Sequence, residues 1–275
     1  MKAIQLFSGV FIAGLFSTQA LAFSVFPLGG GQALKWGDNT VGTPGGVVTW
    51  SFIPAGTAGS AFCGDACPGA SSDAIFIENS PGGGFTLTPL VSLESYIVAA
   101  MDKWAAVANI SFVKFSNDSG VPINDLAAVP GATGQIRIGA FDFASGGGAV
   151  GYAPPPNGGT GAGDLLFDPS SFYQFALGNE GGSFNTTFAP NDFETLLLHE
   201  LGHTLGLAHP VFDGTCPVLQ VGGSCYPLVN RELDADDIAG IQFLYGAAPV
   251  PEADSWAMLL AGLGLVGFAA TRRRD

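Results

Sequence analysis

The chain has 275 residues, and 23 acidic side chains outnumber nine basic ones to give a formal net charge of −14. This excess of negative charge argues against nucleic acids and other anionic surfaces as partners. The 41 glycines, 22 phenylalanines and low charged fraction of 12% indicate a loop-rich globular protein with β-structure rather than a disordered chain.

The N-terminal segment, residues 1–22, reads as a secretory signal peptide. It combines Lys2, an apolar stretch and the A-x-A sequence Ala20-Leu21-Ala22, which predicts cleavage before Phe23. The body of the protein, residues 23–249, is long enough for one sizeable core and is expected to form a single catalytic domain.

The first half of the body predicts an alternation of strands with one long helix. It opens with a glycine-rich leader at 23–45 that we expect to be irregular, and a Gly-, Ser- and Cys-containing insertion follows the first strand. Apolar residues recur at helical spacing over 90–107, which predicts an amphipathic helix. Strands are predicted at 47–53, 110–115, 135–143 and 149–152. The last of these is a candidate edge strand for an extended peptide.

Eleven consecutive residues hold all three histidines of the chain in the pattern HExxHxxGxxH. His199 and His203 are four residues apart, so on a helix both imidazoles lie on one face and can reach one cation. Gly206 lets the chain turn back and bring His209 in as a third ligand. Three neutral nitrogens and a water form the open site typical of catalytic zinc, and Glu200 is placed beside the metal as a general base. A structural zinc is the alternative.

Two helices are predicted in the second half from their capping residues. Asn191 or Asp192 can cap the helix that carries the histidines, and Glu194 lies in its first turn. A final helix is expected from Asp234 to Gly246.

Four cysteines in an exported chain indicate two disulfides. The sequence permits three pairings, of which the local ones, Cys63 with Cys67 and Cys216 with Cys225, are our choice because they close short loops. Free buried thiols are the alternative.

The body as a whole resembles a metzincin, and within that clan the catalytic domain of the matrixins. The resemblance runs from about Trp36 to Gly246. Besides the zinc motif, it is carried by residues 103–104, 110–112, 135–138, 163–168 and 233–246. It implies an α+β fold in which a twisted, mixed, mostly parallel sheet and three main helices border a cleft, with a small C-terminal lobe.

The resemblance also implies further site residues. A methionine turn beneath the zinc is matched by Cys225-Tyr226-Pro227, and a substrate pocket is expected under Tyr226, Pro227 and Leu228. Leu166 stands where many matrixins have a histidine ligand, so we expect one catalytic zinc and no second zinc. Oxygen ligands for calcium are available in the nearby loops. The candidate calcium ligands are Asp142, Asp164 and Asp168.

The C-terminal segment, residues 250–275, resembles the PEP-CTERM sorting signal of Gram-negative bacteria. Val250-Pro251-Glu252-Ala253 precedes an apolar run over 256–270 and then three arginines, although Ala253 stands where the motif has a second proline. The resemblance implies export, transient membrane association, processing by an exosortase-like enzyme, and a final place on the cell surface or outside the cell. A plain membrane anchor is the alternative, although the run is shorter than the roughly 20 residues of a bilayer span.

The combined prediction is an exported, monomeric zinc endopeptidase that hydrolyses polypeptides through a zinc-activated water. One alternative is a catalytically weak or inactive surface or matrix binding protein that retains the zinc site. A zinc hydrolase with a non-peptide substrate is a third reading.

Overall fold

The computed structural model describes residues 23–121, 132–156, 161–187, 189–220, 223–249, 258 and 260–263. The predicted signal peptide lies outside the described residues, as does most of the C-terminal segment. Within the part that is described, no helix is both long and apolar enough to cross a membrane.

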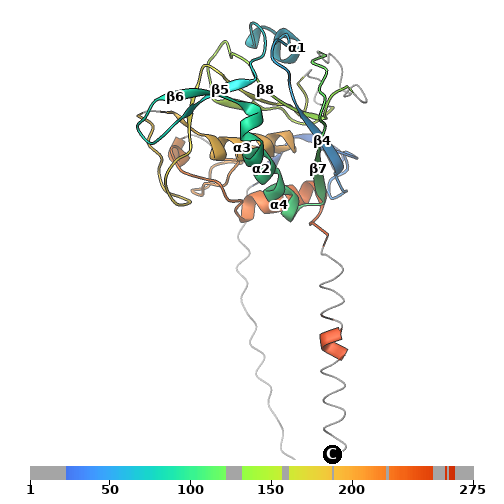
Figure 1. Cartoon of the computed structure of the whole chain (residues 1–275). Coiled ribbons are helices and arrows are strands. Elements are labelled where there is room, and N and C mark those ends of the chain that lie inside the picture. The colour runs from blue at the N-terminus through green and yellow to red at the C-terminus, as the bar shows by residue number, and fades with distance from the viewer. Residues whose placement is uncertain are drawn as a thin grey trace, which may run out of the picture.

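A central five-stranded sheet forms the frame of the body (Figure 1). Its strand order is β7-β4-β8-β10-β9, with bounds Ile110–Lys114, Gly46–Phe52, Ile136–Ala140, Leu165–Phe167 and Ala149–Gly151. All neighbours run parallel except the edge strand β9, which is antiparallel to β10. The predicted mixed, mostly parallel sheet is confirmed, and β9 is left with one open edge.

The three predicted main helices are present, two of them against the sheet and the third against the first of these helices. Glu94–Val107 is α2, preceded by the short 3-10 helix η2 at Leu90–Leu93; Phe193–Thr204 is α3 and Ala235–Tyr245 is α4. The Asp192 side chain caps α3, and Asp234 forms a capping box at the start of α4. Helix α4 and the 3-10 helix η3 at Gly223–Cys225 belong to the smaller C-terminal part that follows α3.

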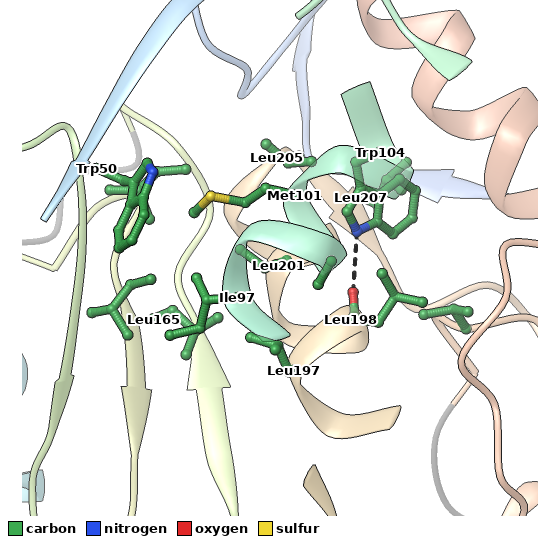
Figure 2. Close-up of a cluster of buried hydrophobic side chains, with 14 of the residues drawn as sticks. Trp50, Ile97, Met101, Trp104, Leu165, Leu197, Leu198, Leu201, Leu205 and Leu207 are labelled. Atoms are coloured by element: carbon green, nitrogen blue, oxygen red, sulfur yellow. Dashed lines mark hydrogen bonds between the residues drawn. The ribbon is translucent and has the colours of Figure 1, made fainter. Parts of the chain in front are cut away.

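The core lies where α2 and α3 meet in front of the sheet (Figure 2). Side chains of the two helices and the sheet fill it: Ile97, Met101, Trp104, Leu197, Leu198, Leu201, Trp50 and Leu165. The Trp104 Nε1–H donates to the Leu198 carbonyl at 3.3 Å, which ties α2 to α3. Burying a side chain of this size contributes about 1.5–3 kcal/mol, so this packing holds α3 rigidly against the frame.

The insertion after β4 contributes two strands to a second sheet that the sequence did not predict, and two later segments complete it. Its strand order is β12-β11-β5-β6, with bounds Asn191–Asp192, Phe172–Gln174, Ala74–Glu78 and Phe85–Pro89. Strands β5 and β6 make an antiparallel pair, and β11 runs parallel to both β5 and β12. Before this sheet come the short helix α1 at Ser60–Cys63 and the 3-10 helix η1 at Gly64–Ala66. Because β12 ends at the cap of α3, the insertion is joined to the start of that helix.

The leader at 23–45 is more ordered than we expected. Strand β1 (Ser24–Val25) pairs antiparallel with β13 (Leu207–Ala208), and β2 (Pro27–Gly29) pairs with β3 (Gln32–Ala33). The Trp36 Nε1–H donates to the Thr204 carbonyl at 2.8 Å, at the end of α3. The backbone N–H of Phe23 donates to Asp236 Oδ1 at 2.8 Å. The leader is therefore an integral part of the fold.

Candidate metal centre

Helix α3 and the turn after it bring the three histidines together. His199 and His203 lie one turn apart on α3, and the helix ends just before Gly206. Gly206 has φ +101°, and a Cβ there would lie 2.1 Å from the Leu34 carbonyl oxygen, so only glycine fits this turn. The chain then runs through β13 and places His209 opposite the helix.

The three Nε2 atoms converge on one point. They lie 3.0 Å apart for His199 and His203, 3.0 Å for His203 and His209, and 3.1 Å for His199 and His209. A tetrahedral zinc with Zn–N bonds of about 2.0–2.1 Å places its nitrogens about 3.3–3.4 Å apart, so the spacing fits zinc with a small adjustment. No other group of three potential side-chain ligands comes this close within the described ranges.

The other ring nitrogens of the two helical histidines are already bonded. His199 Nδ1 lies 2.7 Å from the Val218 carbonyl, and His203 Nδ1 lies 2.7 Å from the Leu207 carbonyl. A carbonyl oxygen only accepts, so each Nδ1 carries the proton and each Nε2 lone pair is left for a cation. Burial, followed by the charge of His203, lowers the pKa of His199 to about 3, and burial lowers that of His203 to about 4. Both rings are therefore neutral, as metal ligands must be.

Glu200 lies beside the triad without joining it. Its Oε1 is 4.0 Å from His199 Nε2, and its Oε2 accepts the backbone N–H of Gly151 at 2.6 Å. Burial raises the pKa of Glu200 to about 8, against the smaller lowering effect of the Gly151 hydrogen bond. A Cβ at Gly151 would lie 2.1 Å from the Glu200 carbonyl oxygen, so this close approach of β9 to α3 requires glycine. No sequence pattern predicted this contact.

A pocket of about 50 Å³ opens next to the triad. It is lined by Phe184, Pro190, Asn191, Asp192, Thr195, Leu196, Val218, Gln220, Cys225, Tyr226, Leu228 and Asn230. Two of the three residues predicted for its wall, Tyr226 and Leu228, line it; Pro227 does not, and its carbonyl accepts the Phe184 N–H at 2.9 Å. Gln220 was not predicted.

The segment below the triad is held at both ends. The backbone N–H groups of Val218 and Leu219 donate to the Asp237 carboxylate of α4 at 2.8 and 3.2 Å. A disulfide joins Cys216 to Cys225, with the Cα atoms 5.6 Å apart. Val218 thus presents its carbonyl to His199 from a fixed backbone. A second disulfide joins Cys63 to Cys67 in the insertion.

The three candidate calcium ligands do not come together. Asp142 is exposed, while Asp164 is fully buried and accepts the Arg137 backbone N–H at 2.9 Å. Asp168 Oδ1 accepts from the Ser170 N–H and hydroxyl, and its Oδ2 is buried without a partner. Since the described part of the chain contains no converging group of carboxylates, the structure does not support a calcium site formed by these three side chains together.

An internal ion pair occupies the neighbourhood of Asp164 instead. Arg137 binds Asp118 through two bonds, Nε to Oδ2 at 2.7 Å and Nη2 to Oδ1 at 2.6 Å. Both side chains are buried, and the guanidinium lies over the Phe62 ring, 4.8 Å from its centroid. The sequence offered one hint, a lone arginine between isoleucines in a predicted strand, but nothing that pointed to Asp118 as its partner.

Comparison with known proteins shows similarity to a family model and to several metalloproteases. The matrixin family model matches residues 88–246, more than half of the chain, and the PEP-CTERM protein-sorting motif matches residues 249–274. Matrilysin of Mus musculus is 34% identical over 140 residues, which cover 46% of each protein. Stromelysin-2 of Rattus norvegicus is 31% identical over 167 residues, 60% of this chain and 31% of that protein.

A bacterial relative shows a similar degree of identity. Karilysin of Tannerella forsythia is 30% identical over 154 residues, 56% of this chain and 28% of that protein. This chain thus spans less than half the length of each of these three relatives. The matrixin match includes α2, the sheet strands after it and the histidine motif, and both resemblances predicted from the sequence are confirmed. The chain belongs to the matrixin family.

Proposed function

We propose that this protein is an exported zinc-dependent endopeptidase. The observation that carries the proposal is the convergence of three Nε2 lone pairs with a buried carboxylate beside them. His199, His203 and His209 would hold the metal. Bound there, zinc supplies Lewis acidity, which lowers the pKa of a bound water to about 7 and polarises a carbonyl.

Glu200 is the group that moves protons in this proposal. It takes one proton from the attacking water and passes it to the nitrogen of the leaving amine, so the amide C–N bond breaks and the Glu200 carboxylate is regenerated. Gly151 steadies the carboxylate through its N–H. The rigid packing of α3 keeps this carboxylate close to the three ring nitrogens.

The open edge of β9 offers a place for an extended peptide. Tyr152 N–H bonds to the Asp164 carbonyl and Asp168 N–H to the Gly148 carbonyl, so these groups of the strand face β10. Backbone groups alternate along an antiparallel strand, so the N–H and C=O of Ala149 and the C=O of Gly151 face the open edge, whereas the Gly151 N–H is already bonded to Glu200. A peptide added there would place one side chain in the neighbouring pocket.

Two sorting signals support the proposal that the protein acts outside the cytoplasm. The C-terminal motif implies export and processing by an exosortase-like enzyme in a Gram-negative bacterium. Together with the predicted signal peptide at 1–22, it leads us to propose polypeptide substrates at the cell surface or outside the cell, cleaved by a monomer.

One observation favours the alternative of a binding protein without turnover. Cys225, a half-cystine, stands in the turn where we expected a methionine beneath the metal. A half-cystine can fill the position expected for the methionine side chain, so we favour the endopeptidase over the binding protein.

The test uses the purified wild-type protein and two variants on a random peptide library. Glu200→Gln should keep one zinc per chain and lower cleavage by about 10²–10⁴-fold, the usual contribution of a general base. Glu232→Gln is the matched control, because the Glu232 side chain is exposed and its partner among the described residues is Lys103. Full activity of zinc-loaded Glu200→Gln would overturn the mechanism. Zinc binding without any cleavage by the wild type would favour the binding protein.

A further inference from the structure

Gln220 contributes an unsatisfied amide to the pocket beside the metal centre. Its Oε1 is buried and has no hydrogen-bond partner, and its Nε2 makes no hydrogen bond to the described residues either. A buried polar group without a partner costs about 1–3 kcal/mol. Such a group in a native structure calls for a ligand that satisfies it.

The other polar side chains of the pocket are already engaged. Thr195 and Asp192 bond to each other, and Asp192 also pairs with Arg231. Tyr226 donates its hydroxyl to the Pro190 carbonyl at 2.9 Å. Asn230 Nδ2 donates to the Cys216 carbonyl at 2.8 Å, and Asn191 Nδ2 bonds to the Phe172 carbonyl. Among the described residues that line the pocket, Gln220 is thus the one with a buried side-chain oxygen that has no hydrogen-bond partner.

Only one side of Gln220 has room for a partner. The residue also borders a hollow beside Pro210 and Asp236, which has no space for a water molecule. The pocket next to α3 has a volume of about 50 Å³. Among the described surroundings, the pocket is therefore the side from which a group can reach the amide.

We propose that Gln220 determines specificity, so that the pocket prefers a substrate side chain ending in a neutral carboxamide or hydroxyl over an apolar one of equal size. This inference rests on the proposed endopeptidase function. A carboxamide or hydroxyl both donates and accepts, so it satisfies the Gln220 amide whichever end faces the pocket. An apolar side chain would seal the amide in without a partner.

The charges around the pocket disfavour ionised side chains. The Asp192 carboxylate is neutralised by Arg231 and bonded on both oxygens, so a lysine would lose hydration with no free anion to meet it. A glutamate would also lose hydration, because the described lining of the pocket offers it no cation. The neutral glutamine side chain is the best match, and methionine is its apolar counterpart of similar length.

The experiment starts from a peptide that the wild type cleaves and varies the positions on either side of the cleaved bond among glutamine, methionine and glutamate. At the position that enters the pocket, we expect kcat/KM for glutamine to exceed that for methionine by roughly tenfold, the equivalent of about 1.4 kcal/mol for one unsatisfied polar group. Gln220→Met should remove this preference or reverse it. Gln32→Met, the same change on exposed β3, should leave the preference intact.

A binding measurement separates this inference from the proposed function. The same peptides are titrated into zinc-loaded Glu200→Gln protein with and without Gln220→Met, and their dissociation constants are compared. Tighter binding of the glutamine peptide, lost with Gln220→Met, supports the inference even if no peptide is cleaved. Equal or tighter binding of the methionine peptide to both proteins would overturn it, whether or not cleavage occurs.

Discussion

Two clusters of ionisable groups in this protein differ in which of their polar atoms remain free. In the histidine triad, the carbonyls of Val218 and Leu207 hold the outer nitrogens, and three inner nitrogens converge with nothing from the protein between them. In the second cluster, the Arg137 guanidinium is bound by both oxygens of Asp118, and its backbone N–H is bound by Asp164. The histidine triad can therefore bind a metal cation, whereas the second cluster already contains a cation, the Arg137 guanidinium.

The difference shows why residue types alone are a weak guide to metal sites. Asp142, Asp164 and Asp168 have the right chemistry for calcium, but one is exposed and another is engaged by a neighbouring backbone. The three histidines equal the three aspartates in number, but they can form a metal site because their free lone pairs converge. A metal site is therefore indicated by ligand atoms that converge and have no other partner, and not by the presence of suitable residues in a loop.

The largest effect is expected from breaking the open cluster. His203→Ala removes the nitrogen that lies 3.0 Å from each of the other two, so we expect zinc to be lost and cleavage to fall to the uncatalysed level. Metal analysis and peptide cleavage measure both effects. A zinc chelator should have the same result, whereas a calcium-selective chelator should leave the melting temperature unchanged if the second cluster needs no cation. A large drop in melting temperature with the calcium chelator would contradict the comparison.

The closed cluster should respond through stability. Arg137→Met leaves the Asp118 carboxylate buried without its partner, which costs about 3–5 kcal/mol in comparable cases. Denaturant unfolding measures the loss. The double variant Arg137→Met, Asp118→Leu removes both charges and should recover most of it. If Arg137→Met lowers the free energy of unfolding by less than about 1 kcal/mol, the guanidinium does not serve as the internal cation that stabilises the Asp118 carboxylate.

The sequence predicted the parts of the site that depend on residues close together in the chain. The spacing of His199 and His203, the cap at Asp192 and the turn at Gly206 all act within one or two helical turns, so a local pattern contains them. The α+β class followed from strand and helix patterns of the same local kind and from the resemblance.

Contacts between distant segments could not be predicted. Strand β5 pairs with β11, about a hundred residues later, and no local pattern in the insertion indicates that partner. The Gly151 contact with Glu200 depends on how closely a strand approaches a helix. The unpaired state of Gln220 depends on where every neighbouring polar group finds its partner. These are properties of packing, which one sequence does not report.

The smallest effect, taken per pH unit, is a change in the pH dependence of stability at the closed cluster. Burial raises the pKa of Asp164 to about 8 despite the nearby Arg137, from an ordinary value of 3.8. The folded protein therefore holds a proton there that the unfolded chain releases above about pH 4, so this group stabilises the fold at low pH and the contribution is lost as the pH rises toward 8.

Asp164→Asn keeps an oxygen for the Arg137 N–H but cannot titrate. It should therefore lose less stability than the wild type between pH 4 and 8, by up to about 1.4 kcal/mol per pH unit, as measured by denaturant unfolding. Burial also raises the pKa of Glu200 and Asp237, so some decline should persist in the variant. Asp142→Asn, at an exposed position, is the control and should follow the wild type. Identical slopes for Asp164→Asn and the wild type would mean that Asp164 is ionised in the folded protein, and the cluster would then carry two carboxylates against a single guanidinium.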